Sequence, residues 1–354
     1  MQDKCQLVLS GNRAVKPAEM FSQMATWCEQ NDVQHDKYGE GTLIQSFERQ
    51  IAELVGFEAG LFVITGTMAQ PTALQIACEQ RGCHNVAMHP SCHIYIHENQ
   101  GYQLQNRFNA LPVGQPYEPW NLSSLLQIPD SLGAVVYELP MREIGGQLPS
   151  FGELEAIKKH CQSQNIHLHM DGARLWESAA YYQRSYQEIA NGFDSVYVSL
   201  YKGVGGLGGA MLLGNKAFID KARIWMHRQG GSVYHRSPYI VAAAMQFEAR
   251  LQTLPALFER TLQLYQLLEQ YPSITANPQT PQANMLHLHL PISQKKAITL
   301  RDNIAKRHSV WIGNPQQGLL PQHSYIEWYV GDTLLNLSDE ELKAYFALIE
   351  EACQ

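Results

Sequence analysis

The segment His167-Leu168-His169-Met170-Asp171-Gly172-Ala173-Arg174 places an acid, a glycine and an arginine directly after a short apolar run. This pattern predicts a buried strand over 167–171 whose carboxyl end carries Asp171. A second such run, over 194–200, ends just before Lys202. Open α/β sheets bind their ligands at the carboxyl ends of their strands. The two strand ends therefore mark a candidate site.

The chain around this segment alternates short apolar runs with amphipathic ones, which is typical of βαβ units. Helices are predicted over 68–80 and from Ser150, because Ser150 and Glu153 have the spacing of a capping box. Further strands are predicted over 61–65, 85–88, 133–138 and 210–213, the last running back from a glycine-rich turn. The fold class that follows is α/β: a mostly parallel mixed sheet flanked by helices.

After about residue 235 the pattern changes, and a small α+β C-terminal domain is predicted. One long helix is expected over roughly 237–269, followed by strands over 285–290 and 325–330 and a last helix capped at Ser338. We expect three parts: an N-terminal segment that packs near the small domain and the site, a large α/β domain, and a connecting helix with the small domain. Their predicted bounds are 1–20, 21–235 and 236–354.

Composition restricts the class of protein. The 354 residues are 45% hydrophobic and 17% charged, and the formal net charge of −7 disfavours a nucleic-acid partner. Seven scattered cysteines form no Cys-x-x-Cys pair, which is typical of a reducing compartment. The first residues lack the apolar core of a signal peptide, and no apolar stretch approaches the roughly 20 residues of a membrane span. We expect a cytoplasmic protein without a membrane partner.

Three polar features fall at predicted strand ends: the turn Thr65-Gly66-Thr67, Asp171 with Arg174, and Lys202. A turn that opens a helix offers N–H groups to a phosphate. Taken together, a phosphate turn, a carboxylate and an amine are the parts that a pyridoxal phosphate enzyme requires. The glycine-rich segment 203–208 also matches G-x-G-x-x-G, but a strand is predicted after it where a dinucleotide site requires a helix. A nicotinamide or flavin site is therefore rejected.

The chain resembles the threonine aldolase and β-eliminating lyase family of fold type I pyridoxal phosphate enzymes. The resemblance covers most of the chain and is strongest from about Tyr38 to Gly231. It rests on four motifs, Tyr38-Gly39-Glu40-Gly41-Thr42, Leu61 to Met68, His169 to Leu175, and Leu200-Tyr201-Lys202-Gly203.

The resemblance implies a role for each candidate residue. Gly66 and Thr67 would hold the phosphate, Asp171 would pair with the ring nitrogen, and Lys202 would form the Schiff base with the cofactor. Arg174 would meet the substrate carboxylate or the phenolic oxygen. His93 would stack on the ring and is a candidate for proton transfer. The family also implies a small amino-acid substrate and a homodimer or homotetramer with shared sites, to which Arg236 and Tyr38 are candidate contributors.

The sequence departs from the family pattern at three places. No histidine follows Glu138 in Leu139-Pro140-Met141-Arg142-Glu143. The arginine that family members carry near the C-terminus is not evident, and the segment 325–329 occupies about its place. Tyr201 precedes Lys202, where family members often have serine. The implied reaction is retro-aldol cleavage of a β-hydroxy-α-amino acid. β-Elimination, racemisation or transamination with the same cofactor stays open, as does a cofactor-binding protein without turnover.

The chain contains fourteen histidines, a residue type that often binds metal ions. His89, His93 and His97 recur every four residues, but Pro90 fits the first turn of a helix and would leave His89 outside it. The strand pairs His167/His169 and His287/His289 are expected to be hydrogen-bonded structural residues. No metal site is predicted.

Overall fold

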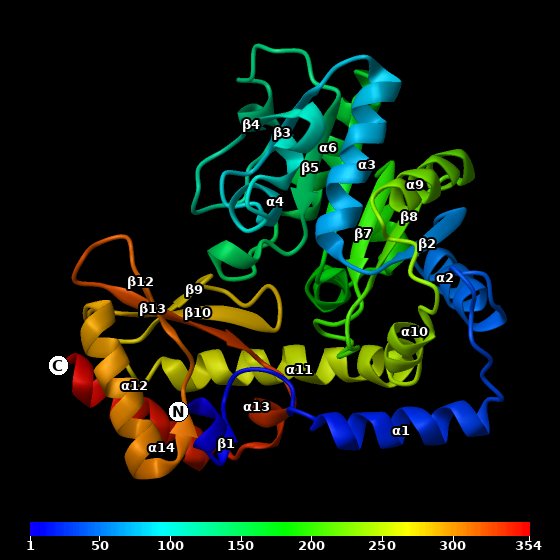
Figure 1. Ribbon diagram of the computed structural model, residues 1–354. Helices are drawn as coiled ribbons and strands as arrows, with labels where there is room; N and C mark the ends of the chain where they lie inside the picture. The colour runs from blue at the N-terminus through cyan, green and yellow to red at the C-terminus, as the bar shows by residue number, and fades with distance from the viewer. The chain divides into compact units, whose positions relative to one another are not determined.

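The computed structural model describes residues 1–354, and the chain forms two compact units. The smaller unit comprises 1–14, 144–147 and 253–354, and the larger comprises 15–143 and 148–252. Figure 1 labels the elements of both along the chain. These units are defined by their internal contacts, so the domain bounds expected from the sequence stay predictions.

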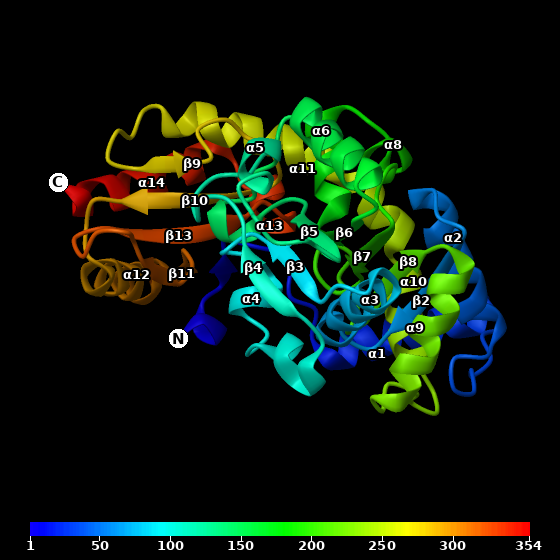
Figure 2. The same cartoon turned by 90° about the horizontal axis from the view of Figure 1, so that it is seen from above.

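The larger unit is built on a seven-stranded sheet in the order β2-β8-β7-β6-β5-β3-β4 (Figure 2). The strand β8 runs antiparallel to both of its neighbours, and the other pairs are parallel. The strands are β2 (Ala59–Val63), β3 (Asn85–Met88), β4 (Asn109–Pro112), β5 (Ala134–Glu138), β6 (His167–Gly172), β7 (Ser195–Ser199) and β8 (Ala210–Gly214). The predicted mostly parallel mixed sheet is confirmed.

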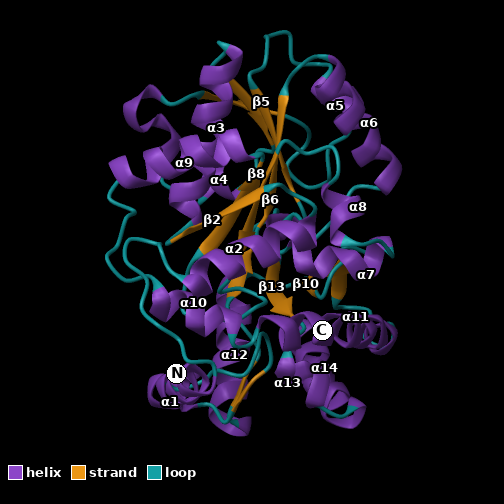
Figure 3. Cartoon of the chain, turned by 90° about the vertical axis from the view of Figure 1, so that its right-hand side faces the viewer, coloured by secondary structure: helices purple, strands orange, loops and turns teal.

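Helices cover both faces of this sheet (Figure 3), and the central strands β5 and β7 are therefore buried along their whole length. Helices α3 and α9 lie on one face, and α5, α6 and α8 lie on the other. The helices of this unit are α1 (Pro17–Gln30), α2 (Thr42–Val55), α3 (Gly66–Arg81), α4 (His93–Ile96), α5 (Leu122–Leu125), α6 (Phe151–Ser163), α7 (Ala179–Tyr182), α8 (Tyr186–Ala190), α9 (Lys216–Arg228) and α10 (Ser237–Ala244).

Local sequence explains where these helices begin and which face they bury. Ser150 and Glu153 form the predicted capping box at the start of α6. Helix α2 buries Ile44, Phe47 and Ile51, which follow one another at helical spacing. Each such side chain contributes about 1.5–3 kcal/mol on full burial. The amphipathic pattern therefore fixes both the helix and its orientation on the sheet.

The smaller unit is an antiparallel sheet in the order β12-β13-β10-β9, with α12 and α14 packed on its apolar face. A short parallel pair, β1 with β11, accompanies it. The elements are β1 (Leu7–Val8), β9 (Thr275–Asn277), β10 (Met285–Leu290), α12 (Gln294–His308), β11 (Val310–Trp311), β12 (Pro315–Gln317), β13 (Ser324–Tyr329), α13 (Asp332–Asn336) and α14 (Asp339–Cys353). The predicted small α+β architecture is confirmed.

The single long helix expected over 237–269 is wrong, because two helices occupy this stretch. Helix α10 ends at Ala244 and α11 (Phe247–Leu268) begins after a two-residue turn. The Gln246 side chain donates to the Ala242 and Gly205 carbonyls, and its own N–H bonds to Ala243 instead of continuing the helical ladder. None of the helices combines the length and apolar character that a bilayer crossing requires.

Candidate active site

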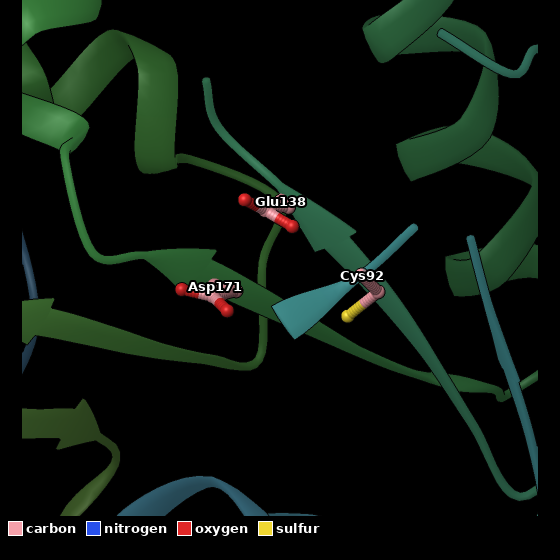
Figure 4. A group of neighbouring side chains, drawn as sticks. All are labelled: Cys92, Glu138 and Asp171. Carbon is pink, nitrogen blue, oxygen red and sulfur yellow. The ribbon is translucent and has the colours of Figure 1, made fainter. Parts of the chain in front are cut away.

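Three buried side chains meet at the carboxyl edge of the large sheet (Figure 4). Glu138 ends β5 and lies opposite Asp171 of β6 in the parallel register. Cys92 comes from the segment between β3 and α4. The Cys92 sulfur and one oxygen of each carboxylate all lie within 4.8 Å of one another. Two acids are therefore held together away from water.

Asp171 is fixed by two donors. Its Oδ2 accepts a hydrogen bond from Gln70 Nε2 on α3 (3.0 Å), and its Oδ1 accepts one from the Ala173 N–H (3.1 Å). The side chain is almost fully buried, at 1% exposure. A carboxylate has about four lone-pair positions, so Asp171 retains capacity for a further donor.

Glu138 faces the same space and has a raised pKa. Burial, reinforced by the Asp171 charge, raises the pKa of Glu138 to about 7. Its two oxygens accept the Arg142 N–H (3.0 Å) and, at 3.4 Å, the His93 N–H. Burial also raises the pKa of the Cys92 thiol well above its usual value. With its pKa raised to about 7, Glu138 can hold a proton beside the Asp171 carboxylate, so the two acids can share one proton.

Lys202 lies on the loop after β7, and hydrogen bonds from this loop to the Ser199 side chain fix its start. The Ser199 hydroxyl accepts the N–H groups of Tyr201 and Lys202, each at 3.3 Å. The side chain is half-buried, and its Nζ makes no hydrogen bond or ion pair within the chain. Burial first, and the Arg174 charge second, lower the pKa of Lys202, while Asp171 opposes the change. A lowered pKa leaves more of the amine neutral and therefore nucleophilic.

Arg174 follows β6, and among the cations it has the largest effect on the pKa of Lys202. Its Nε is buried and has no hydrogen-bond partner. Arg174 as a whole is half-buried, but a buried N–H donor without a partner is costly unless an acceptor completes it. Arg174 is therefore positioned for a carboxylate or phenolate from a bound molecule.

The predicted phosphate turn forms the start of α3. The Thr65 hydroxyl caps the helix by accepting the Met68 N–H (3.2 Å), which leaves the Gly66 and Thr67 N–H groups at the helix start. A Cβ on Gly66 would lie only 2.3 Å from the Tyr197 hydroxyl of β7. Only glycine fits there, and the turn lies one helical turn before Gln70, the donor to Asp171.

His93 begins α4 and is held by an acid from the same short segment. Its Nδ1 donates to Glu98 Oε1 (3.2 Å), and Glu98 is buried with its Oε2 unpartnered. The hydrogen bond to Glu98 raises the pKa of His93 more than burial lowers it. The Asp171 and Lys202 charges also act on His93, which places its ring at the same edge of the sheet.

The remaining predicted histidines differ in their hydrogen bonds. Helix α4 begins at His93 and not at Pro90, so His89 lies outside it, as predicted. His167 and His169 both bond to the Ser195 hydroxyl at 2.7 Å, and His169 Nε2 is buried without a hydrogen-bond partner. His287 Nε2 lies 3.6 Å from Glu327 Oε2, and His289 Nε2 is buried without a hydrogen-bond partner. The expectation that these four histidines are hydrogen-bonded structural residues stays a prediction.

The structure brings Lys202, Asp171, Arg174 and His93 to one edge of the sheet, beside the α3 turn that carries Gly66 and Thr67. Sequence reasoning missed three polar residues at this edge: Gln70, Glu98 and Glu138. Glu138 ends a predicted strand, and this signal was sufficient to include it. The roles of the others depend on contacts that no local pattern encodes.

The donor set fits the pyridoxal phosphate that the resemblance implies. An unpartnered amine at Lys202 and an unpartnered guanidinium Nε at Arg174 lie close to Asp171, which retains acceptor capacity. The helix start at Gly66 offers N–H groups to a phosphate. Each polar group of the cofactor thus has a complementary group in the chain.

Comparisons with known proteins agree with this geometry. A family profile described as Beta-eliminating lyase matches residues 9–291. Low-specificity L-threonine aldolase 1 of Arabidopsis thaliana is 26% identical over 284 residues, 77% of this chain and 79% of that protein.

Two crystal structures are similar over almost the whole chain. A candidate L-allo-threonine aldolase of Listeria monocytogenes is 34% identical with a TM-score of 0.93, covering 99% of this chain and 97% of the other. A candidate aromatic amino acid β-eliminating lyase/threonine aldolase of Exiguobacterium sp. 255-15 is 33% identical with a TM-score of 0.91, covering 99% and 98%. The chain therefore belongs to the β-eliminating lyase family and is a pyridoxal phosphate-dependent lyase of fold type I.

Proposed function

We propose that this lyase cleaves a β-hydroxy-α-amino acid of the L-threonine or L-allo-threonine type into glycine and an aldehyde. The observation that carries the proposal is the unpartnered Lys202 amine beside Asp171 and the unsatisfied Arg174 guanidinium. Relatives named as L-threonine aldolases support the same reaction class.

The chain's own residues would hold the cofactor at defined groups. Lys202 would bind its carbonyl carbon, and the α3 start at Gly66 and Thr67 would bind its phosphate. Asp171 would accept the ring N–H and keep that nitrogen protonated. When bound, pyridoxal phosphate supplies an electron-withdrawing ring that stabilises negative charge at the substrate Cα.

Substrate binding would depend on charge and on the state of Lys202. Arg174 would pair with the substrate carboxylate or the cofactor's phenolic oxygen, which would satisfy its buried Nε. The lowered pKa of Lys202 keeps the amine available for return after each turnover. His93 would stack on the ring, with its orientation set by the Glu98 hydrogen bond.

A second candidate reaction keeps the cofactor and changes the bond that breaks. The segment after Glu138 carries Met141 and not a histidine, which favours β-elimination, racemisation or transamination over aldol cleavage. The family profile and the Exiguobacterium structure carry a β-eliminating name. Elimination would release ammonia and a keto acid, so its products distinguish it from an aldolase.

The test offers cofactor-loaded protein L-threonine, L-allo-threonine and β-phenylserine and measures aldehyde, glycine, ammonia and keto acid. We expect equimolar aldehyde and glycine, lost in Lys202→Ala and retained in Lys216→Ala, whose lysine is exposed and paired with Asp220. Ammonia with a keto acid would replace the proposal with elimination, and a cofactor-loaded protein that releases no product would refute turnover of these substrates.

We also infer a homodimer or homotetramer with shared sites. Tyr38 is 58% exposed, whereas Arg236 is buried, with its Nη atoms bonded to the Phe62 carbonyl and the Ser232 hydroxyl and its Nε unpartnered. Light scattering on the cofactor-loaded protein tests the assembly, and a stable monomer with full activity would contradict it.

A further inference from the structure

The chain lacks a histidine shortly after Glu138, yet the structure places a histidine from another segment in contact with this one. His97, at the end of α4, donates from Nε2 to Glu143 Oε1 at 2.7 Å. Glu143 lies five residues after Glu138, on the segment where the expected histidine is missing. The rings of His97 and His93 have their centroids 5.3 Å apart. His97 is therefore adjacent to the ring that we place on the cofactor.

We propose that His97, oriented by Glu143, accepts the β-hydroxyl proton of the substrate. This inference rests on the proposed retro-aldol reaction and deepens it by naming the base. The hydroxyl O–H bond breaks and the proton bonds to His97 Nδ1. The Cβ–O bond becomes the aldehyde C=O as the Cα–Cβ bond breaks, and its electron pair stays with Cα. A proton later added to Cα completes glycine.

The hydrogen bond to Glu143 determines which ring nitrogen of His97 can accept a proton. With the Nε2–H donated to Glu143, the lone pair of a neutral His97 lies on Nδ1, which makes no hydrogen bond within the chain. The side chains are partly accessible, with 39% of His97 and 21% of Glu143 exposed. A small substrate can therefore reach Nδ1 while a carboxylate holds the ring, an arrangement that general-base histidines require.

The two histidine–glutamate pairs differ in a way that separates their roles. Glu98 is buried and accepts a hydrogen bond from His93 Nδ1 at 3.2 Å, which raises the pKa of His93. This bond occupies Nδ1 of His93, whereas Nδ1 of His97 has no hydrogen-bond partner within the chain. Glu143 Oε1, the atom that holds His97, also pairs with Arg142 Nη1 at 3.3 Å. This division assigns ring contact to His93 and proton acceptance to His97.

The first test compares two reactions, aldol cleavage, which removes the β-hydroxyl proton, and exchange of the glycine α-proton, which does not. Aldol cleavage needs the base, but exchange of the glycine α-proton in D2O does not, because glycine has no β-hydroxyl. We expect His97→Gln to lower kcat for cleavage by about 10²–10³-fold, with glycine exchange and the bound-cofactor absorbance unchanged. His227→Gln, at an exposed histidine on α9, is the matched control and should change neither rate.

Glu143 is a positioning residue in this proposal, and it supplies a second variant. Glu143→Gln should lower cleavage by about 10-fold to 100-fold, and the double variant should be no slower than His97→Gln alone, because the two act as a unit. Histidine ¹⁵N NMR on the protein without cofactor should show His97 as the Nε2–H tautomer, and Glu143→Gln should weaken that preference.

The outcomes distinguish the inference from the reaction on which it rests. Equal losses of cleavage and glycine exchange in His97→Gln, no loss of cleavage, or an Nδ1–H tautomer would each overturn the inference while leaving the aldolase in place. A wild-type protein that exchanges glycine but cleaves no β-hydroxy amino acid would refute the reaction itself, and the inference with it.

Discussion

Replacing Glu138 by glutamine should stabilise the protein without cofactor, and the gain should grow with pH. Glu138 is buried beside Asp171, and its pKa rises from 4.5 to about 7. Between these values the folded chain keeps a proton on Glu138 that the unfolded chain has released. The wild type therefore loses stability as pH rises from about 4.5 to about 7, whereas glutamine stays neutral throughout.

The magnitude follows from the size of the shift. At about 1.4 kcal/mol per pKa unit, full ionisation of Glu138 costs the wild type about 3 kcal/mol relative to the variant. A chain of 354 residues has an unfolding entropy of roughly 0.7 kcal/mol/K, which converts this cost to about 4 °C in melting temperature. Glutamine can still accept the Arg142 N–H, so any constant offset from lost bonding is small and independent of pH.

The assay is thermal unfolding of cofactor-free wild type and Glu138→Gln at pH 5, 6, 7 and 8. The melting-temperature difference should increase in favour of the variant up to about pH 7 and then level off. Glu53→Gln, at an exposed position of α2, is the control and should show no such trend. Parallel curves for Glu138→Gln and wild type across the range would refute the raised pKa and the shared-proton description of the cluster.

Three further substitutions test other parts of the site. Asp171→Asn should lower kcat by about 10²–10³-fold with the cofactor still bound, and unchanged turnover would contradict its role at the ring nitrogen. Gly66→Ala should weaken cofactor binding in a fluorescence titration, because the new Cβ meets the buried Tyr197 hydroxyl at 2.3 Å, and wild-type affinity would contradict the close fit. Ser195→Ala should cost about 2–3 kcal/mol by chemical denaturation, because two buried histidines lose their shared hydroxyl, while cofactor binding persists.

The sequence predicts those features of the fold and the site that depend on the order of residues within one strand or helix. Strand 85–88 and the capping box at Ser150 were predicted with correct bounds, because alternation and cap spacing are local. The carboxyl-edge positions of Asp171 and Lys202 followed from the ends of two apolar runs. In a parallel sheet, such ends converge without further information.

Other features depend on contacts between distant segments and carry no local signal. The His97–Glu143 pair joins residues 46 positions apart, and Glu138 acquires its raised pKa only when the sheet register brings Asp171 beside it. The break between α10 and α11 arises because Gln246 bonds to the Gly205 carbonyl, a partner 41 residues away. Periodicity continues through this break and therefore predicted one helix.

The most direct test of the central claim is to find which lysine carries the cofactor. Borohydride reduction of the cofactor-loaded protein, followed by proteolysis and mass spectrometry, fixes the cofactor to the side chain that holds it. We expect a pyridoxyl group on the peptide that contains Lys202, absent in Lys202→Ala and unaffected by Lys216→Ala. A label on another lysine, or a loaded protein in which no lysine is labelled, would contradict the assignment of Lys202 and the site built around it.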